Sequence, residues 1–278
     1  TEMYNNPITQ RNLEGLRSLG YHIMDPAEGW LACGITGVGR LPEPEAIVDW
    51  LEAKMCSTNE LEGTTILVTA GGTQESIDPV RYIGNRSSGK MGYAIAEQAA
   101  HMGAKVILVS APTSLPIPSG VDFISVDSAV SMQEAVEARY NDVNVVIMAA
   151  AVSDFRVLHK AEQKIKKMES MTIELVKNPD ILQGLGSKKS HQILVGFAAE
   201  TEHVIKYGQD KVAKKNLDML VANDVSKSNA GFNVDTNEGY FLYPDKEPKE
   251  MPNMKKSDLA RHILREVIDL VANKADIN

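Results

Sequence analysis

The loop Gly84-Asn85-Arg86-Ser87-Ser88-Gly89-Lys90 carries residue types that bind phosphate. Ser87, Ser88 and Gly89 stand directly before a predicted helix, where unpaired backbone N–H groups and the helix dipole favour an anion. The alternative is an ordinary helix N-cap formed by Ser87 or Ser88. On this feature alone, a phosphate site and a simple cap both stay open.

Two generic nucleotide motifs fail at their decisive positions. Gly71-Gly72-Thr73 follows a predicted strand, but the Gly-x-Gly-x-x-Gly pattern of dinucleotide-binding loops is absent there. Residues 84–90 match Gly-x-x-x-x-Gly-Lys, yet Met91 stands where a P-loop needs Ser or Thr to ligate Mg²⁺. The run also begins some fourteen residues after the strand. A standard NAD fingerprint and a Walker A loop are therefore both rejected.

Charged side chains supply further candidates for an anion site. Lys164, Lys166 and Lys167 form a basic run. Lys211 and Lys215 lie four residues apart, so their ammonium groups should project from one face of a predicted helix. A solvated surface explains either pattern when it is taken alone.

Asp154 follows three alanines at the end of a predicted strand. Small residues let a nucleobase approach the backbone, and a carboxylate can accept a hydrogen bond from an exocyclic amine. The alternative role for Asp154 is to cap a turn. Phe197 ends another predicted strand, where it can pack on a nucleoside or simply fill the core.

The scaffold for these residues begins near residue 64, where short β-branched runs alternate with longer amphipathic stretches. This pattern is typical of βαβ units, and it predicts an α/β fold with a doubly wound, mostly parallel, Rossmann-like sheet and helices on both faces. The predicted strands are residues 64–70, 105–110, 121–126, 143–150, 193–198 and 218–222. The predicted helices are residues 89–103, 128–141, 202–216 and 257–274.

Ligands of such sheets bind beyond the carboxyl ends of the strands, so the loops after Ala70, Ala150 and Ala198 should carry the site. Residues 157–171 are rich in lysine and poor in apolar residues, and they predict a mobile loop over that site. Asn178 should act as the N-cap of a helix that begins at Asn178-Pro179-Asp180.

The composition narrows the class of partner. The net charge is −8 and the pI is about 5.3, so neither a nucleic acid nor an acidic membrane surface is expected as the main partner. Cys33 and Cys56 give neither a disulfide framework nor a zinc-ligand spacing, which fits a reducing cytoplasm. No run approaches the ~18 apolar residues of a membrane span. Because the sequence opens at Thr1 and not at Met, we expect it to be part of a longer protein.

Residues 1–60 differ in character from the rest. They predict helices at residues 7–19 and 44–55 and a Gly-rich loop at residues 33–40, with too few apolar residues for an independent core. Residues 56–60 should form a linker.

Six motifs stand in order along residues 64–278. They are Gly71-Gly72-Thr73-x-Glu75-x-x-Asp78-Pro79-Val80-Arg81-Tyr82-Ile83-x-Asn85-x-Ser87-Ser88-Gly89-Lys90-Met91-Gly92, Ala149-Ala150-Ala151-Val152-Ser153-Asp154-Phe155-Arg156, Lys164-Ile165-Lys166-Lys167, Lys177-Asn178-Pro179-Asp180, Gly196-Phe197-Ala198-Ala199-Glu200-Thr201, and Asn216-Leu217-Asp218 with Ala222-Asn223-Asp224-Val225. Together they resemble the signature of bacterial phosphopantothenoylcysteine synthetases.

The resemblance implies a ligase that joins 4′-phosphopantothenate to L-cysteine with CTP through an acyl cytidylate, with Mg²⁺ as the counter-ion of the triphosphate and a homodimer as the assembly. Asn85, Arg81 and Lys164 would be catalytic. The residues implied in CTP binding are Ser87, Ser88, Gly89, Met148, Ala149, Ala150, Asp154, Lys164, Pro179, Asp180, Ile181, Leu182, Phe197, Lys211 and Lys215. No dedicated carboxylate cage for a metal is evident in the sequence.

The first sixty residues resemble the C-terminal end of the flavin-dependent phosphopantothenoylcysteine decarboxylase, which is commonly fused upstream of this synthetase. Thr1-Glu2-Met3-Tyr4 and Ala32-Cys33-Gly34 carry that resemblance. Cys33 would be the decarboxylase acid, while FMN would belong to the part of that domain that this sequence lacks. We therefore expect a decarboxylase segment at residues 1–60, without activity by itself, and a ligase domain at residues 61–278.

Two rival hypotheses belong to other functional classes. An NAD(P)-dependent reductase could use the same sheet, although the missing dinucleotide fingerprint counts against it. A non-catalytic regulatory subunit related to these flavoproteins is the other, and the presence of Asn85, Asp154 and Lys164 together disfavours it.

Overall fold

The computed structural model describes residues 1–31, 34–55, 58–167, 169–200, 202–224 and 236–275. The chain divides into two compact units, Thr1–Ser57 and Thr58–Asn278. Cys33, the predicted decarboxylase acid, lies outside the described residues. No helix of the described part is both long and apolar enough to cross a membrane.

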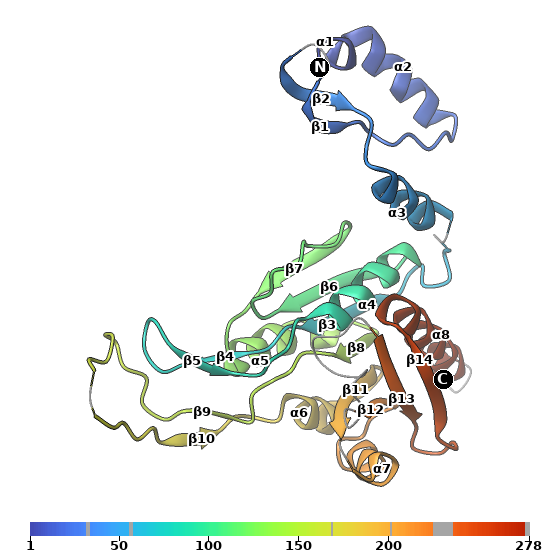
Figure 1. Cartoon of the computed structure of the whole chain (residues 1–278). Helices are drawn as coiled ribbons and strands as arrows, with labels where there is room; N and C mark the ends of the chain where they lie inside the picture. The colour runs from blue at the N-terminus through green and yellow to red at the C-terminus, as the bar shows by residue number, and fades with distance from the viewer. Residues whose placement is uncertain (32–33, 56–57, 168, 201, 225–235, 276–278) are drawn as a thin grey trace. The chain divides into compact units, whose positions relative to one another are not determined.

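An eight-stranded sheet forms the centre of the second unit (Figure 1). Its spatial order is β14-β13-β12-β11-β8-β3-β6-β7, in which the run from β12 to β7 is parallel and β13 and β14 are antiparallel. The strands are β3 (Thr65–Ala70), β6 (Lys105–Ser110), β7 (Val121–Ser125), β8 (Val145–Met148), β11 (Ile193–Glu200), β12 (Met219–Asp224), β13 (Thr236–Leu242) and β14 (Lys249–Lys255). The chain leaves β3 toward one edge and returns through β8 toward the other, so the strand order reverses between β3 and β8.

Helices cover both faces of this sheet. The helices are α4 (Lys90–His101), α5 (Ala129–Glu137), α6 (Ile181–Lys188), α7 (Val204–Lys214) and α8 (Lys256–Ala275), with a short 3-10 turn η1 (Tyr140–Asp142). Alternate residues of β3 enter opposite cores: Ile66 and Val68 pack with α4 and α8, whereas Leu67 packs with α5, α6 and α7. The predicted doubly wound fold is confirmed.

In the central sheet, β8, β13 and β14 differ from the prediction. The strand predicted at residues 143–150 ends at Met148, because Ala149 and Ala150 leave the ladder before Ala151 forms a single bridge with Gly72. The antiparallel pair β13 and β14 was not predicted at all. It extends the sheet beyond β12 and leads directly into α8.

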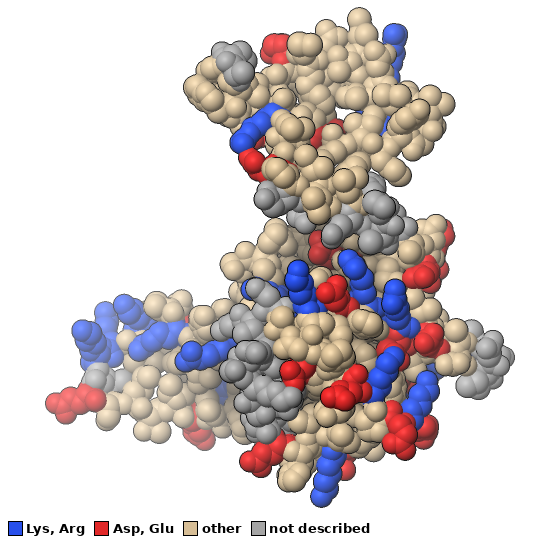
Figure 2. Space-filling view, turned by 45° about the vertical axis from the view of Figure 1, so that its right-hand side comes forward, with Lys and Arg blue, Asp and Glu red and all other residues tan. Residues whose placement is uncertain are grey.

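Two small hairpins extend from the carboxyl side of the sheet (Figure 1), and together with the described residues between their strands they are called the arm. They are β4 (Gln74–Ser76) with β5 (Tyr82–Gly84), and β9 (Phe155–Val157) with β10 (Leu175–Lys177). Basic side chains gather on the arm (Figure 2), where Lys160, Lys164, Lys166 and Lys167 are exposed.

The first unit consists of α1 (Glu2–Asn5), α2 (Pro7–Ser18), β1 (Ala27–Trp30), β2 (Thr36–Arg40) and α3 (Pro44–Met55). None of its described side chains is fully buried. The prediction of a loop across residues 33–40 was wrong for β2, which pairs with β1 in an antiparallel hairpin. The pairing with β1 overrides the low strand propensity of Gly37 and Gly39.

Candidate active site

Two adjoining cavities of about 350 and 310 Å³ open in the second unit. Both are lined by residues that follow β8 and by Phe197 of β11, near the reversal of strand order. This is the position at which open α/β sheets bind ligands. The first cavity also reaches α4 and the second reaches α6, and they share Ala150, Val152, Asp154 and Phe197. They are called the α4 cavity and the α6 cavity.

The N-terminus of α4 lies against the α4 cavity without a side-chain cap. Its N-cap is Gly89, in the left-handed region at φ 76°, and not Ser87 or Ser88 as the alternative hypothesis held. A side chain at Gly89 would place its Cβ 2.6 Å from Thr113 Cγ2, so glycine is required by both conformation and space. No side chain caps the first turn of α4, and the helix dipole at this end favours an anion.

The structure also explains why residues 84–90 are not a P-loop. Gly84 closes β5, an antiparallel hairpin strand, and does not follow a parallel strand of the central sheet. The match to the Walker pattern thus spans the end of the arm and the start of α4.

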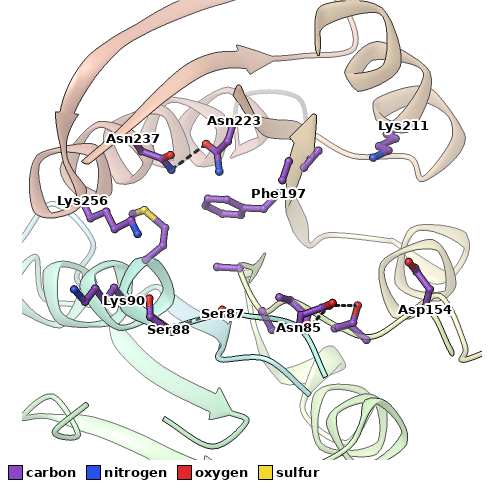
Figure 3. A pocket seen from close by; sticks show the side chains of 18 residues that line it. Asn85, Ser87, Ser88, Lys90, Asp154, Phe197, Lys211, Asn223, Asn237 and Lys256 are labelled. Carbon is purple, nitrogen blue, oxygen red and sulfur yellow. Dashed lines mark hydrogen bonds between the residues drawn. The ribbon is translucent and has the colours of Figure 1, made fainter. Parts of the chain in front are cut away.

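Asn85 lies where the loop before α4 crosses the loop after β8. Its Nδ2 donates to the carbonyl oxygens of Ala151 and Val152, each at 3.3 Å (Figure 3). The loop after β8 is itself fixed to the loop after β3, since the Ala151 N–H donates to the carbonyl of Gly71 at 2.8 Å. These bonds join the three loops and place Asn85 at the α4 cavity.

The α6 cavity is lined by the residues that begin α6. The predicted N-cap Asn178 was wrong: Asp180 caps the helix by accepting from the Gln183 N–H at 3.0 Å. Asn178 is buried, and its Nδ2 donates to the carbonyl of Ser153 at 2.8 Å. Asn178 therefore ties α6 to the loop that carries Asp154.

Lys211 and Lys215 reach different cavities, although Lys211 lies in the last turn of α7 and Lys215 is the C-cap of that helix. Lys211 lines the α4 cavity, while Lys215 lines the α6 cavity and forms an ion pair with Asp180 at 2.9 Å. Burial alone would raise the pKa of the Asp180 carboxyl. The hydrogen bonds from Lys215 and from the Gln183 N–H, with the nearby lysine charges, outweigh burial and lower that pKa.

Most of the predicted nucleotide ligands meet at these cavities. The α4 cavity is lined by Asn85, Ser87, Ser88, Gly89, Ala149, Ala150, Asp154, Phe197 and Lys211, and the α6 cavity by Met148, Ala150, Asp154, Pro179, Asp180, Ile181, Leu182, Phe197 and Lys215. Arg81 and Lys164 line neither cavity.

Arg81 and Lys164 lie together on the arm instead. Asp78, whose side chain is fully buried, accepts from Arg81 Nη2 at 2.6 Å and from the Ile165 N–H at 3.1 Å, and Arg81 also donates to the Ile165 carbonyl at 3.2 Å. The described part of residues 157–171 is therefore hydrogen-bonded to the turn at residues 77–81, and none of these described residues lines either cavity. The hydrogen bond from Arg81 is the largest cause that lowers the pKa of Asp78, and three backbone N–H groups add to it against the effect of burial.

Nine residues that line the α4 cavity were not among the predicted site residues: Lys90, Met91, Ala151, Val152, Ala198, Ala199, Asn223, Asn237 and Lys256. Asn223 lies within one of the sequence motifs, and Lys90 and Met91 directly follow the phosphate loop. These positions could have identified the three residues as candidates for the site. Asn237 and Lys256 come from β13 and α8, far along the chain, and nothing local marked them.

The family described as DNA/pantothenate metabolism flavoprotein C-terminal domain matches residues 61–271. The chain belongs to this family. A second family, described as flavoprotein, matches residues 1–56. The curated coenzyme A biosynthesis bifunctional protein CoaBC of Bacillus subtilis (strain 168) is 47% identical over 272 residues, which are 96% of this chain and 67% of that protein.

Two solved structures share the fold of this family member. The crystal structure of the C-terminal domain of a coenzyme A biosynthesis bifunctional protein CoaBC has a TM-score of 0.68 and 44% identity, and the match covers 78% of this chain and 100% of that one. A Cab2 mutant in complex with phosphopantothenate-cysteine has a TM-score of 0.59 at 18% identity, covering 84% of this chain and 96% of that one. The second likeness shows the fold alone.

Proposed function

We propose that residues 61–278 form a ligase that joins 4′-phosphopantothenate to L-cysteine at the expense of CTP. The relatives named above as coenzyme A biosynthesis proteins support this assignment. The products would be phosphopantothenoylcysteine, CMP and pyrophosphate.

The chemistry proceeds in two steps, because the oxygen of a carboxylate is a poor leaving group. In the first, a carboxylate oxygen of the acid attacks the α-phosphorus of CTP, and the bond to the leaving pyrophosphate breaks. In the second, the cysteine amine attacks the acyl carbon, loses a proton and displaces CMP. Both steps need placed donors and cations more than they need a protein nucleophile.

The observation that carries the proposal is the placement of Asn85 between the two parts of a nucleotide-sized site. On one side stands the uncapped N-terminus of α4, which suits a phosphate chain. On the other stand Asp154, Phe197 and the start of α6, which suit a base and its sugar. The α-phosphate would then lie near the Asn85 amide, which can donate to the acyl oxygen and accept from the amine.

The remaining roles follow from position. Asp154 would accept from the exocyclic amine of cytosine, and Lys211 and Lys215 would contact the ribose or the triphosphate. Lys164 and Arg81 would act from the arm of a partner subunit in a homodimer, because they lie outside both cavities of their own chain.

Mg²⁺ would enter with the triphosphate. Among the described residues there is no group of three or more His, Cys, Asp and Glu side chains that could hold a metal ion. A magnesium ion would then be held mainly by phosphates and water. The ion would neutralise charge on the phosphates.

We assign residues 1–60 to the C-terminal segment of a decarboxylase domain, which the flavoprotein match to residues 1–56 supports. FMN would be held by the remainder of such a domain.

Pyrophosphate release tests the function. The chain with CTP, Mg²⁺ and 4′-phosphopantothenate should release pyrophosphate, and L-cysteine should convert the intermediate into phosphopantothenoylcysteine, both followed by mass spectrometry. The reductase hypothesis predicts instead that NADPH binds and is oxidised. A regulatory subunit would do neither.

A further inference from the structure

We infer that Lys256, Asn223 and Asn237 form a second phosphate-binding wall of the α4 cavity, on the side away from Asp154 and Lys211. The inference rests on the proposed function only for the identity of the ligand. Figure 3 shows these three side chains together on one side of the cavity, while Asp154 and Lys211 lie on the other side. None of the three was assigned to the nucleotide or the acid above.

Two helices begin at this wall, and each begins with a lysine. Lys90 is the first residue of α4 and Lys256 the first of α8, and both line the α4 cavity. The helices have 12 and 20 residues and pack side by side, with Arg261 Nε donating to Gln98 Oε1 at 3.2 Å. Two N-termini and two lysines thus supply positive potential to one small volume.

Lys256 is placed unusually for a lysine. It is only 8% exposed although it opens a helix next to a strand end, and it lines the cavity. At this position the Lys256 ammonium group adds positive charge to the wall, while Asp154 stands on the far side of the cavity.

The asparagine pair supplies an independent observation. Asn237 Nδ2 donates to Asn223 Oδ1 at 3.0 Å across β12 and β13. Asn237 is 3% exposed, yet its Oδ1 has no hydrogen-bond partner among the residues that the structure describes. Buried amide groups normally have hydrogen-bond partners, so an unsatisfied amide atom beside a cavity points to a ligand. Rotation of both amides keeps the bond between them and presents an N–H donor in place of the oxygen.

The wall therefore offers a cation, a carboxamide and helix N–H groups, which is the donor set for a phosphate group. Two phosphates of the proposed reaction share this chemistry: the terminal phosphates of CTP, which leave as pyrophosphate, and the phosphomonoester of the acid. The position opposite the base side favours the terminal phosphates.

The test uses the full chain and four variants. Lys256→Met keeps the apolar stem and removes the charge, Lys256→Arg keeps the charge, and Lys255→Met is the matched control, since Lys255 is the exposed neighbour. Asn237→Asp places a carboxylate at the wall. Binding of inorganic pyrophosphate is measured by calorimetry and by the shift in melting temperature, and neither readout needs turnover.

We expect Lys256→Met and Asn237→Asp to weaken pyrophosphate binding by roughly tenfold to a hundredfold, the effect of losing a charged hydrogen bond. Lys256→Arg should retain most of the affinity, and Lys255→Met should match the wild type. If Lys256→Met melts like the wild type and binds pyrophosphate equally well, the wall does not hold the terminal phosphates of CTP.

Steady-state kinetics separate the two phosphates. If the wall holds the nucleotide, Lys256→Met raises the KM for CTP and weakens product inhibition by pyrophosphate. If it holds the acid, the variant raises the KM for 4′-phosphopantothenate and leaves CTP unchanged. Variants with unchanged binding and unchanged KM for both substrates overturn the inference. A chain that binds pyrophosphate through Lys256 but releases none from CTP refutes the proposed function and leaves the wall standing.

Discussion

Asn85 bridges two loops through its side-chain Nδ2, with long hydrogen bonds of 3.3 Å to the carbonyls of Ala151 and Val152. Such bonds hold an amide in place but exchange readily for better partners. In the proposed reaction the better partner is the acyl oxygen of the cytidylate, which appears only after the first step. The amide should therefore serve the second step.

We predict that Asn85→Ala and Asn85→Asp still form the acyl cytidylate but fail to transfer it to cysteine. Single-turnover experiments, quenched and analysed by mass spectrometry, should show the intermediate accumulating. Pyrophosphate release that disappears as completely as ligation would show that Asn85 acts earlier.

Asp154 lines both cavities, so its carboxylate can face a base held between them. We predict that CTP is strongly preferred over UTP, because the O4 of uracil would oppose the carboxylate and leave a buried group unpaired, at a cost of about 1–3 kcal/mol. Asp154→Asn offers a donor and an acceptor, and the ratio of kcat/KM for CTP and UTP should shrink. An unchanged ratio with a lower rate would move base selection to the backbone of residues 149–151.

Sequence reasoning placed Asp154 in the site because it follows a parallel strand of the central sheet. It failed where a cap was involved. Ser87 and Asn178 are favourable caps by type, but Gly89 and Asp180 hold those positions, because the backbone before α4 needs a left-handed residue and Asn178 is engaged by Ser153. Local preference cannot foresee a tertiary partner. Asn237 and Lys256 were missed for the same reason, because their positions depend on the pairing of β13 with β14, which the hydrophobic pattern of the sequence did not predict.

At the scale of elements, the arm is the part that departs most from the expected picture. The lysine-rich segment was expected over the site, yet its described residues are fixed to the turn at residues 77–81 by Asp78 and by the bond from the Ala161 N–H to the Ile77 carbonyl at 3.0 Å. Lys164 is exposed on this arm. It would act by reaching a ligand bound elsewhere than in the cavities of its own chain.

We predict that Lys164→Gln slows the first half-reaction by about a hundredfold, the scale of losing one charge contact to the transition state. The melting temperature should stay close to that of the wild type, since the side chain is exposed. The measurement is the burst of pyrophosphate in the absence of cysteine. Lys160→Gln, on the same arm, is the matched control, and an unchanged burst in Lys164→Gln would reduce the basic run to a solvated surface.

Asp78 links Arg81 to the segment that carries Lys164, and its pKa is lowered from the ordinary value of 3.8 mainly by the Arg81 hydrogen bond. A lowered pKa means that the ionised carboxylate stabilises the fold above the ordinary value and that this contribution is lost as the pH falls below it. We predict that Asp78→Asn destabilises the protein at neutral pH and that the difference from wild type narrows below about pH 4. Urea unfolding at several pH values checks this. A difference that does not change with pH would assign the loss to packing.

The other elements were predictable to the extent that their hydrophobic pattern was regular. The buried parallel strands β3 and β6 read as continuous apolar runs, and α8 shows the period of an amphipathic helix. The strands β2, β9 and β10 are short and exposed, and β14 contains Pro252, so the sequence carried no comparable signal.

At the scale of the whole molecule, the residues needed for the proposed reaction do not all meet within a single chain. Asn85, Asp154 and Phe197 line the α4 cavity, whereas Arg81 and Lys164 stand apart on the arm. The proposed symmetric dimer would bring them together, because a twofold axis that places one arm at the partner's cavity does the same in return. The assembly would then be a condition of activity.

Complementation between two inactive variants tests this arrangement. In a mixed dimer of Asn85→Ala and Lys164→Gln subunits, one site carries both defects and the other carries none, provided that Lys164 acts on the partner's cavity. Random association makes half of the dimers mixed, so about a quarter of the wild-type ligase activity should return. Co-expression with two affinity tags isolates the mixed dimer, which should then show about half. In the control pair Asn85→Ala and Lys211→Ala, each variant changes a residue that lines the α4 cavity of its own chain. Both sites of the mixed dimer then keep a defect, so ligase activity should not return. If Asn85→Ala with Lys164→Gln stays as inactive as that control while light scattering shows a dimer, Lys164 serves its own chain, and the arm must leave the turn at residues 77–81 to reach the α4 cavity.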